Sequence, residues 1–88
     1  MSTRAITWAM ERQGLKSSTK FVLVALANYA NEQHEAYPSV AALESDTCQD
    51  RKTVLANLRR LVDGGFLMDS GKRVGSTAQV VVYRLAVG

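Results

Sequence analysis

The chain has 88 residues, 47% hydrophobic and 22% charged, and a net charge of +3, which predicts one globular domain over residues 1–88 and excludes disorder. Its longest apolar run, Phe21 to Ala27, is far shorter than the ~20 residues of a membrane span, and the N-terminus lacks the layout of a signal peptide. The single cysteine, Cys48, excludes an internal disulfide and a zinc site made of thiolates, so we expect a cytoplasmic protein that holds no metal.

A first helix is predicted over about residues 3–13. Ser2 or Thr3 can cap its N-terminus, and Gly14 can take the left-handed conformation that ends a helix. The inward face is expected to hold Ile6, Ala9, Met10 and Gln13. Trp8 lies off that face and is expected to cover a neighbouring helix. The surface around Trp8 and Met10 is a candidate for self-association, so a homodimer is one alternative to a monomer.

The most hydrophobic stretch is a second predicted helix, about residues 18–31, with Ser17 or Ser18 as its cap. Its alanines favour a helix over a strand. Few polar positions remain among its apolar side chains, which are Phe21, Val22, Leu23, Val24, Ala25, Leu26, Ala27, Tyr29 and Ala30. A helix that is apolar nearly all round is a buried one, so this segment is expected to form the core.

Two further helices, about four residues apart, follow a polar connection. The third is predicted to start at Ser39 and to reach about Asp46, with an apolar stripe made of Val40, Leu43 and Thr47. The fourth is predicted to run from an N-cap at Asp50 to Asp63, and Gly64 follows where a left-handed residue is needed. The core-facing residues of the fourth helix are expected to be Val54, Leu58, Leu61 and Val62.

The periodicity changes in the last part of the chain. Residues 66–68 and 79–85 are expected to be strands, joined by a loop over residues 69–77 that contains glycine. Three to four helices followed by a C-terminal β-hairpin make an α+β fold, the winged helix-turn-helix. The helix-turn-helix is expected at about residues 39–63 and the wing at about residues 66–85.

The turn Thr47-Cys48-Gln49-Asp50 gives the last two helices the spacing of a helix-turn-helix. In that motif the first helix crosses the phosphate backbone and the second lies in the major groove of double-stranded DNA. A rotation of about 100° per residue places on the outer side of the second helix Lys52, Ala56, Arg59, Arg60 and Asp63. Thr53 flanks that side, and Arg51, which is nearer the packed side, can swing outward from the first turn.

The side chains at the start of this helix are candidates for contacts with base edges or phosphates, namely Gln49, Arg51, Lys52 and Thr53. Arg59 and Arg60 are expected to meet phosphates, and the small Ala56 lets the helix approach the groove floor. Asp50 is expected to cap the helix, since a carboxylate repels phosphates. The alternative is that these cations only solubilise an exposed helix.

The wing carries a second group of candidates. Lys72 and Arg73, followed by Ser76 and Thr77, are expected to reach a phosphate or the minor groove, although an ordinary hairpin turn would have the same composition. Residues 1–50 hold four Lys or Arg and six Asp or Glu, whereas residues 51–88 hold seven and two. Such an asymmetry is typical of a polyanion-binding face.

Five segments resemble a known family: residues 36–43 (AYPSVAAL), 50–54 (DRKTV), 58–61 (LRRL), 65–67 (GFL) and 82–85 (VYRL). From about Ala5 to Leu85 the chain is similar to the winged helix-turn-helix domains of phage and plasmid proteins, including replication initiators, and of bacterial regulators. The resemblance implies sequence-specific binding of double-stranded DNA in transcription regulation or replication initiation. It also implies a recognition helix that starts near Asp50, where Arg51, Lys52 and Thr53 match the family's basic-basic-Thr start.

One position departs from the family. The turn residue at Gln49 is usually apolar and packed into the core. Either Gln49 turns outward and reads DNA, or Cys48 takes the packing role. The resemblance to initiators also favours a chain that is the N-terminal part of a longer protein.

An enzyme is the poorest fit to the sequence. His34 is the only histidine and is expected in a surface loop, and Cys48 is expected as a small buried turn residue. Gly64-Gly65 lacks the context of a phosphate-binding loop. We therefore expect no catalytic residue, no cofactor and no small-molecule ligand.

The serious rival is a winged helix that docks onto replication or transcription proteins without binding DNA, because fold does not fix function. Salt separates the two interpretations. Binding through several phosphates weakens steeply with added salt, whereas an apolar protein contact barely responds.

Overall fold

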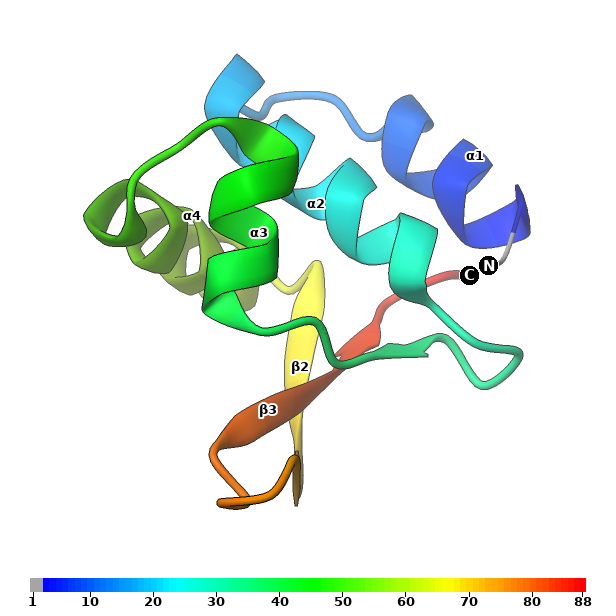
Figure 1. Ribbon diagram of the computed structural model, residues 1–88. Coiled ribbons are helices and arrows are strands. Elements are labelled where there is room, and N and C mark those ends of the chain that lie inside the picture. The colour runs from blue at the N-terminus through cyan, green and yellow to red at the C-terminus, as the bar shows by residue number, and fades with distance from the viewer. Residues whose placement is uncertain (1–2) are drawn as a thin grey trace.

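Four helices and a three-stranded antiparallel sheet make up residues 3–88, the part of the chain that the computed structural model describes (Figure 1). The helices are α1 (Thr3–Glu11), α2 (Ser17–Tyr29), α3 (Val40–Thr47) and α4 (Arg51–Asp63). The strands are β1 (Glu35–Ala36), β2 (Leu67–Val74) and β3 (Val80–Leu85). The predicted α+β winged helix-turn-helix is confirmed, with β1 as an addition that sequence patterns did not predict.

Side-chain caps fix the starts of α3 and α4, and the cap at Asp50 is the one that the sequence predicted. The Ser39 hydroxyl accepts a hydrogen bond from the Ala42 N–H at 3.0 Å, and the Asp50 carboxylate accepts one from the Thr53 N–H at 2.8 Å. Each bond satisfies a backbone donor that has no partner within the helix.

The predicted serine cap of α2 is wrong. Ser17 is already helical, and the N-cap is Lys16, whose side chain makes no capping bond. The Lys16 carbonyl instead accepts the first intrahelical bond, from the Lys20 N–H at 2.9 Å. For α1, Ser2 lies outside the described residues, and Thr3 is already part of the helix.

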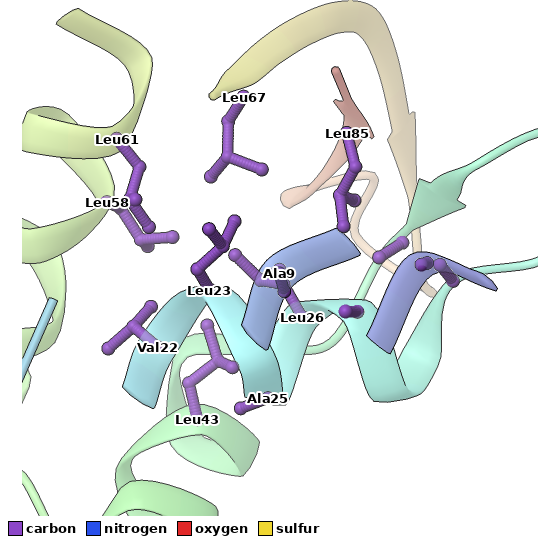
Figure 2. Close-up of a cluster of buried hydrophobic side chains, with 14 of the residues drawn as sticks. Ala9, Val22, Leu23, Ala25, Leu26, Leu43, Leu58, Leu61, Leu67 and Leu85 are labelled. Carbon is purple, nitrogen blue, oxygen red and sulfur yellow. The ribbon is translucent and has the colours of Figure 1, made fainter. Parts of the chain in front are cut away.

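The core forms around α2, which packs against the three other helices and β1. Figure 2 shows Leu58, Leu61 and Leu67 pointing toward Leu23 of α2. The prediction that α2 forms the core is confirmed, but not on all its sides, because Phe21 and Tyr29 are exposed. Packing on three sides leaves part of the α2 surface open to solvent.

The predicted inward face of α1 is confirmed for Ala9 and for Ile6, which packs half-buried against the core, and is wrong for Met10 and Gln13, which are exposed. The buried residues are Ala5, Trp8 and Ala9, whereas Met10 is exposed. Trp8 therefore belongs to the core, and the guanidinium of Arg12 covers its ring at 5.4 Å from the centroid. The reason is that α1 packs mainly on α2, so its orientation follows the large indole, which gains the most from burial.

The sheet has the strand order β1-β3-β2. Ala36 of β1 lies opposite Tyr83, and β2 pairs with β3 from Leu67–Leu85 to Val74–Val80, with an irregularity between Asp69 and Arg73. The predicted loop over residues 69–77 is wrong for residues 69–74, because β2 continues to Val74. Figure 1 shows the wing, β2 and β3 with their connecting turn, extending away from the helices.

A Schellman arrangement connects α4 to β2, and its left-handed residue is one position later than predicted. Gly64 is right-handed, with a φ of −80°, and Gly65 has a φ of +82°. The Phe66 N–H donates to the Leu61 carbonyl at 2.9 Å, and the Gly65 N–H donates to the Val62 carbonyl at 3.0 Å. Gly64 is needed for another reason, since an added Cβ would lie 2.9 Å from the Phe66 ring.

None of the helices within residues 3–88 combines the length and the apolar character that crossing a membrane requires.

Truncation of Leu58 tests the packing of α4. Leu58 is 4% exposed, so we expect Leu58→Ala to lower the free energy of unfolding by about 2–5 kcal/mol, because it leaves a cavity against α2. The matched control is Val62→Ala on the same helix, where the side chain is 38% exposed and the expected loss is below about 1 kcal/mol. Urea denaturation measures both, and equal losses would contradict the observed orientation of α4.

Candidate nucleic-acid interface

The turn between α3 and α4 lies at residues 48–50, within the predicted segment. Cys48 ends α3 in the left-handed conformation, with a φ of 55°. Its side chain is exposed, so the prediction of a small buried turn residue is wrong. A left-handed residue directs the chain sharply away from the axis of α3, which leaves the Cys48 side chain on the outside.

Gln49 turns inward, contrary to both predicted alternatives for this turn. Its Nε2 donates to the Ser18 carbonyl at 3.1 Å, and its Oε1 accepts from Asn57 Nδ2 at 2.9 Å. A polar residue can occupy this usually apolar position because the donor and the acceptor of its amide are both satisfied. The side chain of Gln49 therefore connects the turn to α2 and α4.

Asn57 is the buried centre of this polar contact, with 0% of its surface exposed. Its Oδ1 accepts from Thr19 Oγ1 at 2.7 Å and from Arg60 Nη1 at 3.0 Å. The apolar pattern of α4 did not indicate Asn57, because only apolar side chains define such a core-facing stripe. The position of Asn57 was informative, since it lies three residues after Val54 and four before Leu61 on the buried stripe.

The predicted outer side of α4 is exposed as expected. Lys52, Arg59 and Arg60 are exposed, and so is Arg51 in the first turn. Thr53 and Ala56 are half-buried beside them. Among residues 3–88, no ion pair involves a cation of α4. Apart from the attraction between Lys52 and the nearby Asp50 carboxylate, the positive charge of this surface is therefore not offset by an ion pair within the described residues.

Asp50 is engaged as a cap, as predicted. Side-chain and backbone hydrogen bonds from Thr53, helped by the charge of Lys52, hold the pKa of Asp50 below its ordinary value. The carboxylate thus stays ionised, and it is turned toward the backbone of α4.

Leu55 adds an exposed apolar side chain to the same helix, at 43% exposure. A groove of about 440 Å³ connects it to Arg51 of α4 and to Val81 and Tyr83 of β3. The predicted core-facing set did not include Leu55, although Leu55 lies three residues before Leu58 and seven before Val62, which is a helical spacing. On this side α4 therefore faces the wing across the groove, and on its other side it contacts α2 through the bond between Asn57 and Thr19.

The structure places Lys72 and Arg73 on β2 and not in the connecting turn. Arg73 makes a bidentate contact with Asp69, and each N···O distance is 3.0 Å. The hydrogen bond from the Gly71 N–H, and next the bonds from Arg73, lower the pKa of Asp69. Ser76 and Thr77 are exposed in the turn itself. The wing therefore differs from α4, since its cations already have carboxylate partners.

Glu35 holds the wing to the rest of the domain. It is 8% exposed, and it accepts from Lys72 Nζ at 3.0 Å and from Arg84 Nη2 at 3.2 Å. The hydrogen bond from Lys72, together with that from Arg84, holds the pKa of Glu35 below its ordinary value. Sequence patterns missed this residue, because a single carboxylate in a polar connection does not reveal cations that lie about forty and fifty residues later in the chain.

His34 lies in the same connection, half-buried and with a φ of 62°. No group of three or more His, Cys, Asp or Glu side chains within residues 3–88 is arranged to hold a metal ion.

A family model described as a helix-turn-helix domain matches residues 13–67 of the chain. The match spans α2, β1, α3 and α4 and ends at the first residue of β2, so it includes the whole helix-turn-helix and leaves out most of the wing. No curated protein matches the chain, and no solved structure does.

Acidification tests the anchoring of the wing by Glu35. Because the folded-state pKa of Glu35 is depressed, its contribution to stability is present above its unfolded pKa of 4.5 and is lost as the pH falls through the folded value. We therefore expect Glu35→Gln to be less stable than the wild type near neutral pH, and the difference to shrink below about pH 4.5. Thermal midpoints measured across this range check it. Glu32→Gln, in the same connection but exposed, is the control, and a Glu35→Gln difference independent of pH would contradict the assignment.

Proposed function

We propose, from the premise that this chain belongs to the helix-turn-helix domain family, that it binds double-stranded DNA sequence-specifically and has no catalytic activity. In this motif the second helix enters the major groove and presents its N-terminal residues to base edges. That helix is α4, and its N-terminus carries Arg51, Lys52 and Thr53.

The observation that carries the proposal is the set of unpaired cations on the outer side of α4. Lys52 is the principal candidate for a base edge, with Thr53 and Arg51 beside it on either flank. Arg59 and Arg60 face phosphates further along the helix. Because Ala56 has a small side chain, α4 can approach the groove floor between these contacts.

Gln49 is assigned a different role from the one predicted. Its amide is used within the protein, by Ser18 and Asn57, so it positions the turn instead of reading a base. The wing contributes contacts of lower strength to the backbone or minor groove. Lys72 and Arg73 would have to share their carboxylate partners with phosphates, whereas Ser76 and Thr77 are open to DNA.

The proposal extends to the biological setting on the basis of the sequence resemblance alone. The proposed biological role of the DNA binding is transcription regulation or replication initiation of the phage and plasmid type, in the cytoplasm and without a cofactor. The rival is docking onto another protein without DNA. The affinity for a duplex selected from a random pool should fall steeply with salt, whereas no duplex binding at low salt would favour the rival.

Removal of two charges at the start of α4 tests the recognition helix. We expect Arg51→Ala with Lys52→Ala to weaken binding to the selected duplex by more than tenfold, since each good base contact contributes about 1–3 kcal/mol of discrimination. An electrophoretic shift assay at low salt measures the change, and circular dichroism checks the fold. The control is Arg4→Ala with Arg12→Ala, which removes the same charge from α1 and from the residue after its end, and α1 packs on the other side of α2 from α4 (Figure 1). Equal losses in the two double variants would mean that only net charge matters.

Removal of the wing cations tests the second contact. Lys72→Ala with Arg73→Ala should weaken binding less than the α4 variant, because both cations are already paired with carboxylates. The loss should be the same for selected and random-sequence duplexes, as expected for phosphate contacts. A loss confined to the selected duplex would show that the wing reads bases.

A further inference from the structure

We propose that Asn57 is a positioning residue for DNA binding, because its buried amide holds the guanidinium of Arg60 ready for a phosphate. This inference rests on the proposed function of α4. It assigns to a neutral, fully buried side chain an effect on affinity that it exerts only through Arg60.

Both the oxygen and the nitrogen of the Asn57 amide have hydrogen-bond partners. Its oxygen accepts from Thr19 Oγ1 at 2.7 Å and from Arg60 Nη1 at 3.0 Å, and its nitrogen donates to Gln49 Oε1 at 2.9 Å. Gln49 in turn donates to the Ser18 carbonyl at 3.1 Å. A buried polar network whose members are satisfied is rigid, so the oxygen that meets Arg60 has a fixed position.

Arg60 differs from the neighbouring Arg59 in having its guanidinium bonded to the buried Asn57. Both side chains are exposed, but only Arg60 has a hydrogen bond to an anchored group among the bonds of residues 3–88. A guanidinium has five N–H donors, so one bond to Asn57 leaves most of its donors for a phosphate. Arg60 therefore loses less side-chain freedom on binding than an arginine that is free in solution.

The group that anchors Arg60, the amide of Asn57, carries no charge. An amide orients the guanidinium without cancelling its charge. On the wing, Arg73 is held by the carboxylate of Asp69, which compensates its charge. A carboxylate at position 57 would orient Arg60 equally well but would weaken its attraction for a phosphate. The neutral partner is thus suited to an arginine that must stay available to an anion.

A double-mutant cycle between Asn57 and Arg60 tests the inference, with a random-sequence duplex as the probe. Immobilising a flexible side chain typically costs about 0.5–1.5 kcal/mol, so Asn57→Leu should weaken binding by about 2–10-fold when Arg60 is present. In the Arg60→Ala background the same change should have no effect. Arg60→Ala itself should lower the salt slope by about 0.9, the value for one phosphate contact.

Thr19→Val is the matched control, because it removes the Thr19–Asn57 bond and leaves the bond between Asn57 and Arg60. It should lower the thermal midpoint without changing the affinity. Equal effects of Asn57→Leu in both backgrounds, or a loss of affinity in Thr19→Val as large as in Asn57→Leu, would overturn the inference. If Asn57→Leu fails to fold, Arg60→Lys takes its place, and it should bind about 2–10-fold more weakly with an unchanged salt slope. Unchanged affinity in Arg60→Lys would overturn the inference as well.

The failure of this inference is distinguishable from that of the proposed function. A wild-type chain that binds no duplex at low salt would overturn both. A wild-type chain that binds with the expected salt dependence, but shows no coupling between positions 57 and 60, would overturn the positioning role alone.

Discussion

The rotation of α4 about its own axis decides which of its side chains meet solvent, and the packing of α4 on α2 fixes that rotation. Val54, Leu58 and Leu61 provide the apolar part of this contact. Asn57 provides the polar part through Thr19. Apolar side chains alone tolerate small rotations, because dispersion is not directional, whereas hydrogen bonds have preferred distances and angles. The orientation of the basic side of α4 therefore depends on the whole set of bonds at Asn57, which reaches α2 through Gln49 as well as through Thr19.

The same contact links α4 to the turn that precedes it. Gln49 is bonded at once to Ser18 of α2 and to Asn57 within α4, so the start of α4 cannot shift without breaking a bond to α2 or a bond to the middle of α4 itself. The side-chain amides of Gln49 and Asn57 satisfy part of each other's hydrogen-bonding groups, which a single polar residue at this place could not do. It explains how a polar side chain occupies a turn position for which the family resemblance implies an apolar one, whereas the left-handed conformation of Cys48 leaves that side chain outside.

Charge is distributed differently in space than along the chain. The basic second part of the sequence includes both α4 and the wing, but the cations of the wing are paired with Asp69 and Glu35. Glu35 comes from the acidic first part and crosses to the wing through β1. Within this basic second part, the cations without an ion pair are therefore those of α4, and the wing is a surface of lower positive charge than its composition indicates.

The sequence by itself determined the four helices, the two strands of the wing and much of the proposed surface. The cap at Asp50, the apolar stripe of Val54, Leu58 and Leu61 on α4, and the end of α4 at a glycine are local signals, and local signals depend on neighbours a few residues apart. Tertiary structure decided the burial of Trp8, the pairing of Lys72 with Glu35, and the inward turn of Gln49 toward Asn57. Each of these depends on a partner from a distant or differently oriented element, which no periodicity along the chain encodes. Polar side chains in particular can be satisfied by water or by protein, and only the folded arrangement of donors and acceptors selects between the two.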